Sequence, residues 1–134
     1  MTKMKVNYLG DLRTNSVHLQ SGNKIFTDAP KDNHGKGEAF SPTDMLASSL
    51  ASCVLTIMAI KGKSMDIELK GVEIEVEKMM TESPRRVGEI ILTVNWNGLD
   101  QKIEASKLDS LKRSGLSCPV MLSLAPEVKK TIHW

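Results

Sequence analysis

The two cysteines of this 134-residue chain, Cys53 and Cys118, are the residues whose chemistry is most distinctive. A thiolate can bind a metal, attack an electrophile or pair with a second thiol. The two lie 65 positions apart, which fits neither a C-x-x-C redox motif nor a zinc knuckle. Two cysteines are also too few for the disulfide framework of a small secreted protein. The role of each thiol therefore has to be judged from its surroundings.

The first cysteine stands within the apolar stretch FSPTDMLASSLASCVLTIMAIKG, residues 40–62. Ser41 is a good N-cap residue, and Pro42 fits the first turn of a helix. Asp44 comes three residues after the cap, where its carboxylate can accept from free backbone N–H groups and meets the positive helix end. We therefore expect a helix that begins at Pro42 and ends at Gly62.

One apolar stripe is expected along this helix, because its members recur at spacings of three and four: Leu46, Leu50, Cys53, Ile57 and Ile60. Small residues on the opposite flank would permit close packing. Cys53 should therefore face other parts of the protein. An inert core thiol is the simplest interpretation of such a position, because unmodified cysteine is often buried. That interpretation and a reactive one both remain open here.

Cys118 has a different setting, because it directly precedes Pro119. Proline disfavours helical geometry in the residue before it but fits a first helical turn. We expect Cys118 at or near the N-cap of a short helix that ends before Pro126. The N–H groups and the positive end of a helix lower thiol pKa values, although the sulfur could equally well only fill the cap. The two thiols could form a reversible disulfide if their Cα atoms approach within about 7 Å.

The remaining sequence predicts a mixed α+β chain. Alternating or strand-like patterns mark five segments: 4–10, 17–27, 67–80, 87–98 and 126–134. Residues 28–40 are rich in Gly, Pro, Asp and Asn and predict a loop. Residues 100–114 carry an amphipathic pattern and predict a surface helix stopped by Gly115.

Composition excludes several classes of function. A formal charge of +2, from 18 basic and 16 acidic residues, predicts no nucleic-acid or anionic-membrane partner. The apolar runs are shorter than the roughly 18 residues of a membrane span, and the N-terminus lacks a signal-peptide core, so we expect a cytoplasmic protein. His18, His34 and His133 lie in separate segments, which predicts no metal site. The length suits one domain, residues 1–134.

Three segments together resemble the OsmC/Ohr family, named for osmotically induced protein C and the organic hydroperoxide resistance protein. They are the opening YLGDLRT, the helix FSPTDMLASSLASCVLTIMAI and the late segment LSCPVMLSLAPEVKKTIHW. The resemblance covers nearly the whole chain and is nearer to the short, less characterised branch of the family. It implies an α+β OsmC-like fold, with antiparallel β-sheets wrapped around a long central helix in an intertwined homodimer.

The resemblance also implies an activity, that of a thiol-dependent peroxidase that reduces organic hydroperoxides under oxidative stress. Cys53 would be the attacking thiolate, and Cys118 would resolve its sulfenic acid as an internal disulfide. No cofactor is implied. A dithiol such as a lipoylated protein would supply the electrons.

A buried reactive thiol needs a nearby cation, because desolvation raises its pKa. The family takes an arginine from the N-terminal strands, and Arg13 in GDLRT is the candidate here; it could also be an ordinary exposed residue. Where well-studied relatives carry an arginine-orienting glutamate after the helix-opening proline, this chain has Thr43. Asp44 or Glu38 would have to replace that glutamate, although Asp44 also suits the helix cap.

A second hypothesis is a binding module rather than an enzyme. It would keep the dimeric pocket, lose turnover and hold a small apolar ligand, lipid-like or aromatic, in the same cleft. Peroxide consumption separates the two hypotheses.

Overall fold

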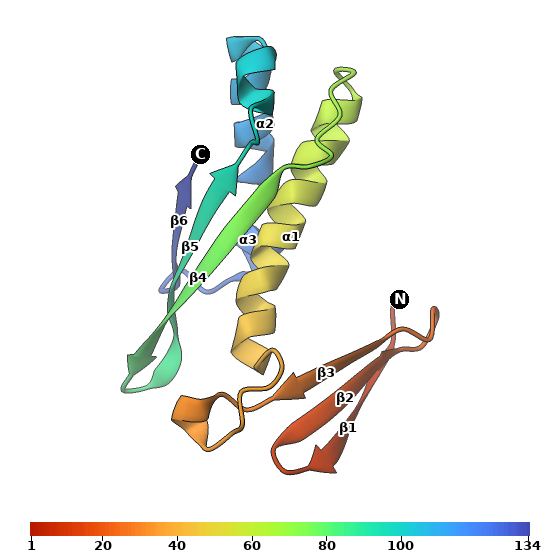
Figure 1. Ribbon diagram of the computed structural model, residues 1–134, viewed down its shortest axis with the longest axis vertical. Coiled ribbons are helices and arrows are strands. Elements are labelled where there is room, and N and C mark those ends of the chain that lie inside the picture. The colour runs from red at the N-terminus through yellow and green to blue at the C-terminus, as the bar shows by residue number, and fades with distance from the viewer. The chain divides into compact units, whose positions relative to one another are not determined.

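The structure is a computed structural model that describes residues 1–134. The chain forms two compact units, Met1–Leu46 and Ala47–Trp134, each with its own three-stranded sheet (Figure 1). The mixed α+β class expected from the sequence is confirmed. The expectation of a single domain over residues 1–134 stays a prediction.

The first unit is an antiparallel sheet of β1 (Met4–Gly10), β2 (Arg13–His18) and β3 (Lys24–Asp28), in that order. The strand predicted at residues 4–10 is confirmed. β2 begins at Arg13, four residues before the predicted start at residue 17. A tight turn at Asp11 and Leu12 reverses the chain directly after β1, so that β2 can pair with it from Arg13 onward. In this register Arg13 lies directly opposite Asp28.

The loop after β3 contains a single 3-10 turn, η1 (Lys31–Asn33), and leads into α1 (Pro42–Lys63). The start of α1 is fixed by a reciprocal capping pair. The Ser41 N–H donates to the Asp44 carboxylate at 2.9 Å, and the Asp44 N–H donates to Ser41 Oγ at 3.0 Å. The predicted start at Pro42 is confirmed, and α1 runs one residue beyond Gly62.

The second unit is built on β4 (Glu73–Glu82), β5 (Arg85–Asn95) and β6 (Lys129–His133). β4 and β5 form the expected antiparallel hairpin, with glutamates on the solvent face of β4. β6 pairs parallel to β5, which corrects the expectation of purely antiparallel sheets. The reason is the connection, because the chain returns through η2 (Leu99–Lys102), α2 (Ala105–Gly115) and α3 (Pro119–Ser123) rather than by a tight turn.

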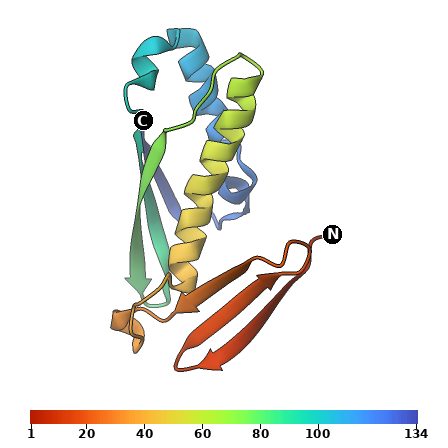
Figure 2. The same cartoon turned by 45° about the vertical axis from the view of Figure 1, so that its right-hand side comes forward.

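In the second unit α1 runs along one face of the β4–β5–β6 sheet (Figures 1 and 2). Leu50, Val54 and Met58 of α1 are completely buried there. The expected stripe is partly wrong, because Leu46 is 40% exposed and Ile60 is 61% exposed. A helix that is apolar on most sides does not reveal from its sequence which side meets the sheet.

The contact between α1 and α2 depends on a glycine. A Cβ atom at Gly115 would lie 3.1 Å from side-chain carbons of both Val54 and Met58. The missing side chain therefore lets the end of α2 approach α1 closely. This approach precedes Cys118 by three residues and brings α3 towards α1.

By length and composition alone, α1 is apolar enough to cross a membrane, a test that the core helix of a soluble protein also passes. Within this chain, 28% of the most apolar 18-residue window of α1 is buried. Most residues of that window are therefore at least partly exposed in the single chain.

Candidate functional site

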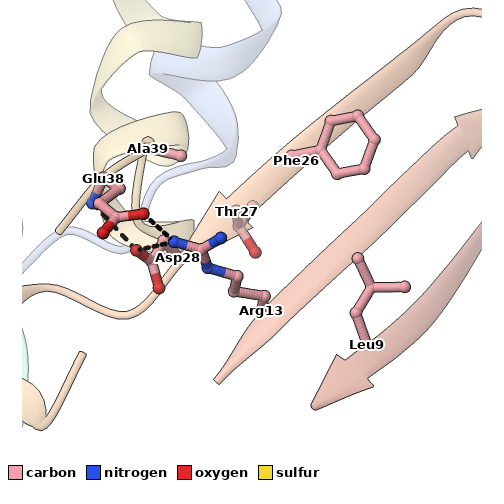
Figure 3. Close-up of a pocket in the computed structure, with 7 residues that line it drawn as sticks. All are labelled: Leu9, Arg13, Phe26, Thr27, Asp28, Glu38 and Ala39. Atoms are coloured by element: carbon pink, nitrogen blue, oxygen red, sulfur yellow. Dashed lines mark hydrogen bonds and ion pairs between the residues drawn. The ribbon is translucent and has the colours of Figure 1, made fainter. Parts of the chain in front are cut away.

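A pocket of about 300 Å³ opens in the first unit (Figure 3). Its walls combine apolar side chains with one guanidinium and two carboxylates. The lining residues are Leu9, Arg13, Phe26, Thr27, Asp28, Glu38 and Ala39.

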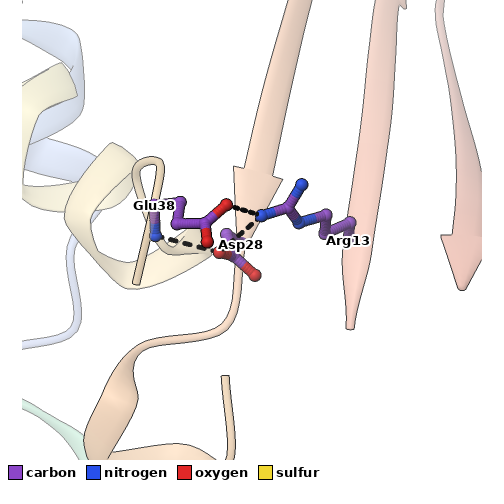
Figure 4. A network of polar contacts seen from close by, with 3 residues as sticks. All are labelled: Arg13, Asp28 and Glu38. Carbon is purple, nitrogen blue, oxygen red and sulfur yellow. Dashed lines mark hydrogen bonds and ion pairs between the residues drawn. The ribbon is translucent and has the colours of Figure 1, made fainter. Parts of the chain in front are cut away.

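Arg13 and Glu38, both singled out by the sequence, meet in this pocket. Arg13 Nη2 donates to Glu38 Oε2 and lies 3.5 Å from Asp28 Oδ2 (Figure 4). The hydrogen bond with Glu38, followed by the charge of that carboxylate, raises the pKa of the Arg13 guanidinium. The Glu38 side chain is 62% exposed, so water screens this ion pair.

Asp28 is the member of the pocket that the sequence reasoning missed. Its side chain is only 1% exposed, and its Oδ2 accepts from the Glu38 backbone N–H at 2.9 Å. That backbone hydrogen bond, opposed by burial and assisted by Arg13, lowers the pKa of the Asp28 carboxyl. Asp28 Oδ1 and Arg13 Nε are both buried without a hydrogen-bond partner. Only the pairing register of β2 and β3 reveals that Asp28 faces Arg13.

Two glycines close the loop that carries Glu38. The Gly35 N–H donates to Pro30 O at 3.0 Å, and the Gly37 N–H donates to Ala29 O at 3.1 Å. A Cβ atom on Gly35 would lie 1.7 Å from the Ala29 carbonyl oxygen, so no other residue fits there without moving the backbone. The loop consequently folds back onto the end of β3.

Asp44, the other carboxylate considered for the site, is engaged at the start of α1. Its Oδ2 accepts from the Ser41 N–H in the capping pair described above. The capping role expected from the sequence is therefore confirmed. Whether Asp44 also acts on Arg13 stays a prediction.

Cys118 lies in the second unit and is completely buried. It is the N-cap residue of α3, as expected, and its Sγ accepts from the Met121 N–H at 3.3 Å. The expected lowering of its pKa is wrong in direction. Burial raises the pKa of the Cys118 thiol, the Met121 N–H counteracts this in part, and a side-chain interaction with Cys53 raises the pKa further. Desolvation outweighs the short helix because a five-residue helix offers few aligned peptide groups.

Cys53 is half-buried on α1 and packs against the core of the second unit. Both cysteines are free thiols, and the interaction that shifts Cys118 places them beside one another. Of the five residues predicted for the site, Arg13 and Glu38 form an ion pair in the first unit. Cys53 and Cys118 both belong to the second unit, where Cys53 acts on the pKa of Cys118. No cluster of three or more His, Cys, Asp or Glu side chains is arranged to hold a metal ion.

The family model described as "OsmC-like protein" matches residues 35–133 of this chain. Because that is well over half of the sequence, the chain belongs to the OsmC-like family. The resemblance seen in the sequence is thereby confirmed. A comparison with curated proteins gives no match.

Solved structures agree with this assignment. A Psychrobacter arcticus protein, provisionally described as an osmotic stress induced and detoxification response protein, is 48% identical, with a TM-score of 0.92 over 99% of this chain and 95% of that one. The organic hydroperoxide resistance protein OsmC of Legionella pneumophila is 17% identical, with a TM-score of 0.76 over 99% and 95%. OhrB of Bacillus subtilis, an organic hydroperoxide resistance protein, is 15% identical, with a TM-score of 0.63 over 99% and 96%. The last two show a shared fold.

The raised pKa of Cys118 gives a prediction for its titration. Burial favours the neutral thiol, so the Cβ carbon shift of Cys118 in NMR spectra should report a midpoint above the ordinary value of 9.0. Cys53→Ala should lower this midpoint, because it removes the neighbouring thiol that raises it. Ser52→Ala, an exposed neighbour on α1, is the control and should leave the midpoint unchanged. A midpoint below 9.0 in the wild type would mean that the helix end dominates after all.

Proposed function

We propose that this protein is a thiol peroxidase that reduces organic hydroperoxides, with Cys53 as the attacking thiol and Cys118 as the resolving thiol. The observation that carries the proposal is the interaction of the two free thiols inside the second unit. Membership of the OsmC-like family supports the substrate class, because relatives with this fold are described as organic hydroperoxide resistance proteins.

The chemistry balances in two steps. The Cys53 thiolate attacks the outer oxygen of the hydroperoxide, the O–O bond breaks, and the alkoxide leaves and takes up a proton to become the alcohol. Cys53 is then a sulfenic acid. The Cys118 sulfur attacks the Cys53 sulfur, its proton leaves with the hydroxyl as water, and a disulfide forms. Two electrons have passed to the peroxide, and an external dithiol must return them.

The electrostatics of Cys118 suit the second step. Before oxidation, burial above all, and then the interaction with Cys53 and its charge, raise the pKa of the Cys118 thiol. A sulfenic acid on Cys53 is neutral at this stage, so its formation removes the repulsion between two thiolates. Cys118 therefore becomes easier to deprotonate when a thiolate is required for resolution.

Arg13 is given the role of favouring the Cys53 thiolate in this proposal. It carries the positive charge of the pocket in the first unit, as the family resemblance suggested. We propose a dithiol such as a lipoylated protein as the reductant and the cytoplasm as the compartment.

We also propose that the protein is a homodimer. Large apolar side chains are more than half exposed on the small sheet of the first unit: Met4, Val6, Tyr8, Leu9, Ile25 and Phe26. Leu46 and Ile60 of α1 are likewise exposed in the single chain. Exposed apolar surface of this kind usually marks an interface, and a second copy of the same chain is the partner that the family resemblance implies.

A ligand-binding module that lacks turnover is the alternative, and the pocket in the first unit is the observation that favours it. Native mass spectrometry of freshly purified protein would detect a bound apolar molecule. A ligand of this kind, together with the absence of peroxide consumption, would support the alternative.

Single cysteine variants test the proposed roles. Wild-type protein given one equivalent of cumene hydroperoxide should lose both free thiols and two hydrogens in mass. Cys118→Ser should react once and stop at a sulfenic acid on Cys53, which a dimedone-type reagent captures. Cys53→Ser should consume no peroxide beyond the slow background. If Cys53→Ser keeps the fast reaction and Cys118→Ser loses it, the two roles are reversed.

Sedimentation equilibrium tests the dimer. At micromolar concentration the protein should sediment as twice its 14.8 kDa mass. The double variant Val6→Lys and Tyr8→Lys places two charges on one face of β1 and should shift the equilibrium towards monomer. Lys5→Gln, on the other face of β1, is the control and should leave the dimer intact. A stable wild-type monomer at this concentration would contradict the proposal.

A further inference from the structure

We propose that Asp28, which no sequence motif assigns, is the positioning residue that holds the Arg13 guanidinium. The sequence offered Glu38 and Asp44 for this role, and the proposal gives it to Asp28 ahead of the exposed Glu38 side chain. The importance of Arg13 for the Cys53 thiol rests on the proposed peroxidase function, whereas the contact between Asp28 and Arg13 is independent of that function.

The first argument is the position of Asp28 in the sheet. Arg13 is the first residue of β2, Asp28 is the last residue of β3, and the two are direct cross-strand partners. Neighbouring strands lie about 5 Å apart, which fixes the two backbones relative to one another. Asp28 is 1% exposed, so its carboxylate has little freedom to turn away. The guanidinium thus meets a rigid, buried acceptor.

The second argument is that one oxygen of Asp28 serves two elements (Figure 4). Asp28 Oδ2 accepts from the Glu38 backbone N–H at 2.9 Å and lies 3.5 Å from Arg13 Nη2. The same carboxylate therefore contacts β2 and the loop that precedes α1. The Glu38 side chain reaches Arg13 from a backbone that Asp28 already holds.

The third argument is the weakness of the alternatives. Glu38 is 62% exposed, and exposed ion pairs contribute little because water screens them. Asp44 caps the start of α1 through the Ser41 N–H. Asp28, by contrast with Glu38, is 1% exposed and is the direct cross-strand partner of Arg13.

The charges in the pocket allow a positioning role of Asp28 to be distinguished from a purely electrostatic one. Arg13 contributes one positive charge, and Asp28 and Glu38 together contribute two negative charges, with Lys36 also acting on Asp28. If Asp28 acted only through its charge, neutralising it would strengthen the positive field of Arg13 and speed the thiol reaction. If Asp28 positions Arg13, neutralising it frees the guanidinium and slows the reaction.

The test compares Asp28→Asn with Glu38→Gln, and Asp66→Asn is the matched control. Asp66 is exposed, lies in the second unit and has the left-handed backbone that asparagine tolerates. The second-order rate constant of Cys53 with cumene hydroperoxide should fall roughly ten- to a hundredfold in Asp28→Asn. It should fall less than about fivefold in Glu38→Gln. It should not change in Asp66→Asn. A faster reaction in Asp28→Asn, or a larger loss in Glu38→Gln, would overturn the proposal.

Two further variants separate positioning from general damage. In an Arg13→Ala background, Asp28→Asn should cause no additional loss of rate, because Asp28 acts through Arg13. Asp28→Glu keeps the charge but displaces the carboxylate by one methylene, and it should also slow the reaction. If circular dichroism shows that Asp28→Asn does not fold, the rate of Asp28→Glu is used in its place. Full additivity in the double variant would contradict a positioning role.

A readout that needs no peroxide distinguishes failure of this proposal from failure of the proposed function. The Arg13 Nε–H is buried, so its NMR resonance should show a rigid heteronuclear NOE in the wild type. That rigidity should persist in Glu38→Gln and should drop in Asp28→Asn to the level of the exposed Arg113. If the Arg13 Nε–H becomes mobile in Glu38→Gln but stays rigid in Asp28→Asn, Glu38 is the residue that positions Arg13. An unreactive wild type would refute the peroxidase and leave this result standing.

Discussion

The approach of Cys118 to Cys53 is the interaction on which the proposed chemistry depends. It requires α3 to begin beside the middle of α1, and several features of the second unit produce that arrangement. Gly115 lets the end of α2 come close to Val54 and Met58, three residues before Cys118. Pro119 then starts α3 directly after the cysteine, and the chain continues into β6. A buried thiol and a half-buried thiol are thereby held together in a well-packed core.

Burial has opposite consequences for the two halves of the proposed chemistry. It excludes water from a reactive sulfenic acid, but it also disfavours a thiolate. The raised pKa of Cys118, the proposed resolving thiol, shows this cost for the second step. A cation is the usual remedy, and the first unit holds one in Arg13, with Asp28 buried beneath it and Glu38 at the surface. Each unit thus holds a compact set of polar groups that its own backbone fixes.

Local signals in the sequence were sufficient for the starts of α1 and α3, whereas α2 begins at Ala105, five residues later than its pattern indicated. Ser41, Pro42 and Asp44 predicted the start of α1, and Cys118 before Pro119 predicted the N-cap of α3, because capping depends on residues adjacent in the chain. The resemblance to a family rested on the segments around these two helix starts together with YLGDLRT, and it predicted the fold class.

Features that depend on distant residues could not be predicted in this way. The buried side of α1, the parallel pairing of β6 and the facing of Asp28 to Arg13 are all set by tertiary contacts. The pKa of Cys118 belongs to this group as well. Its helix position was visible in the sequence, whereas its complete burial, which decides the direction of the shift, was not.

The most direct test of the account is an equilibrium titration of the reduced protein against a glutathione redox buffer, followed by mass spectrometry and non-reducing electrophoresis. If Cys53 and Cys118 form one redox couple, oxidation should be a single two-electron transition. The redox potential should then change by about 30 mV for each tenfold change in the ratio of oxidised to reduced protein. The product should be one internal disulfide within each chain. Oxidation that yields only glutathione adducts on separate cysteines, or disulfides between chains, would contradict the central claim.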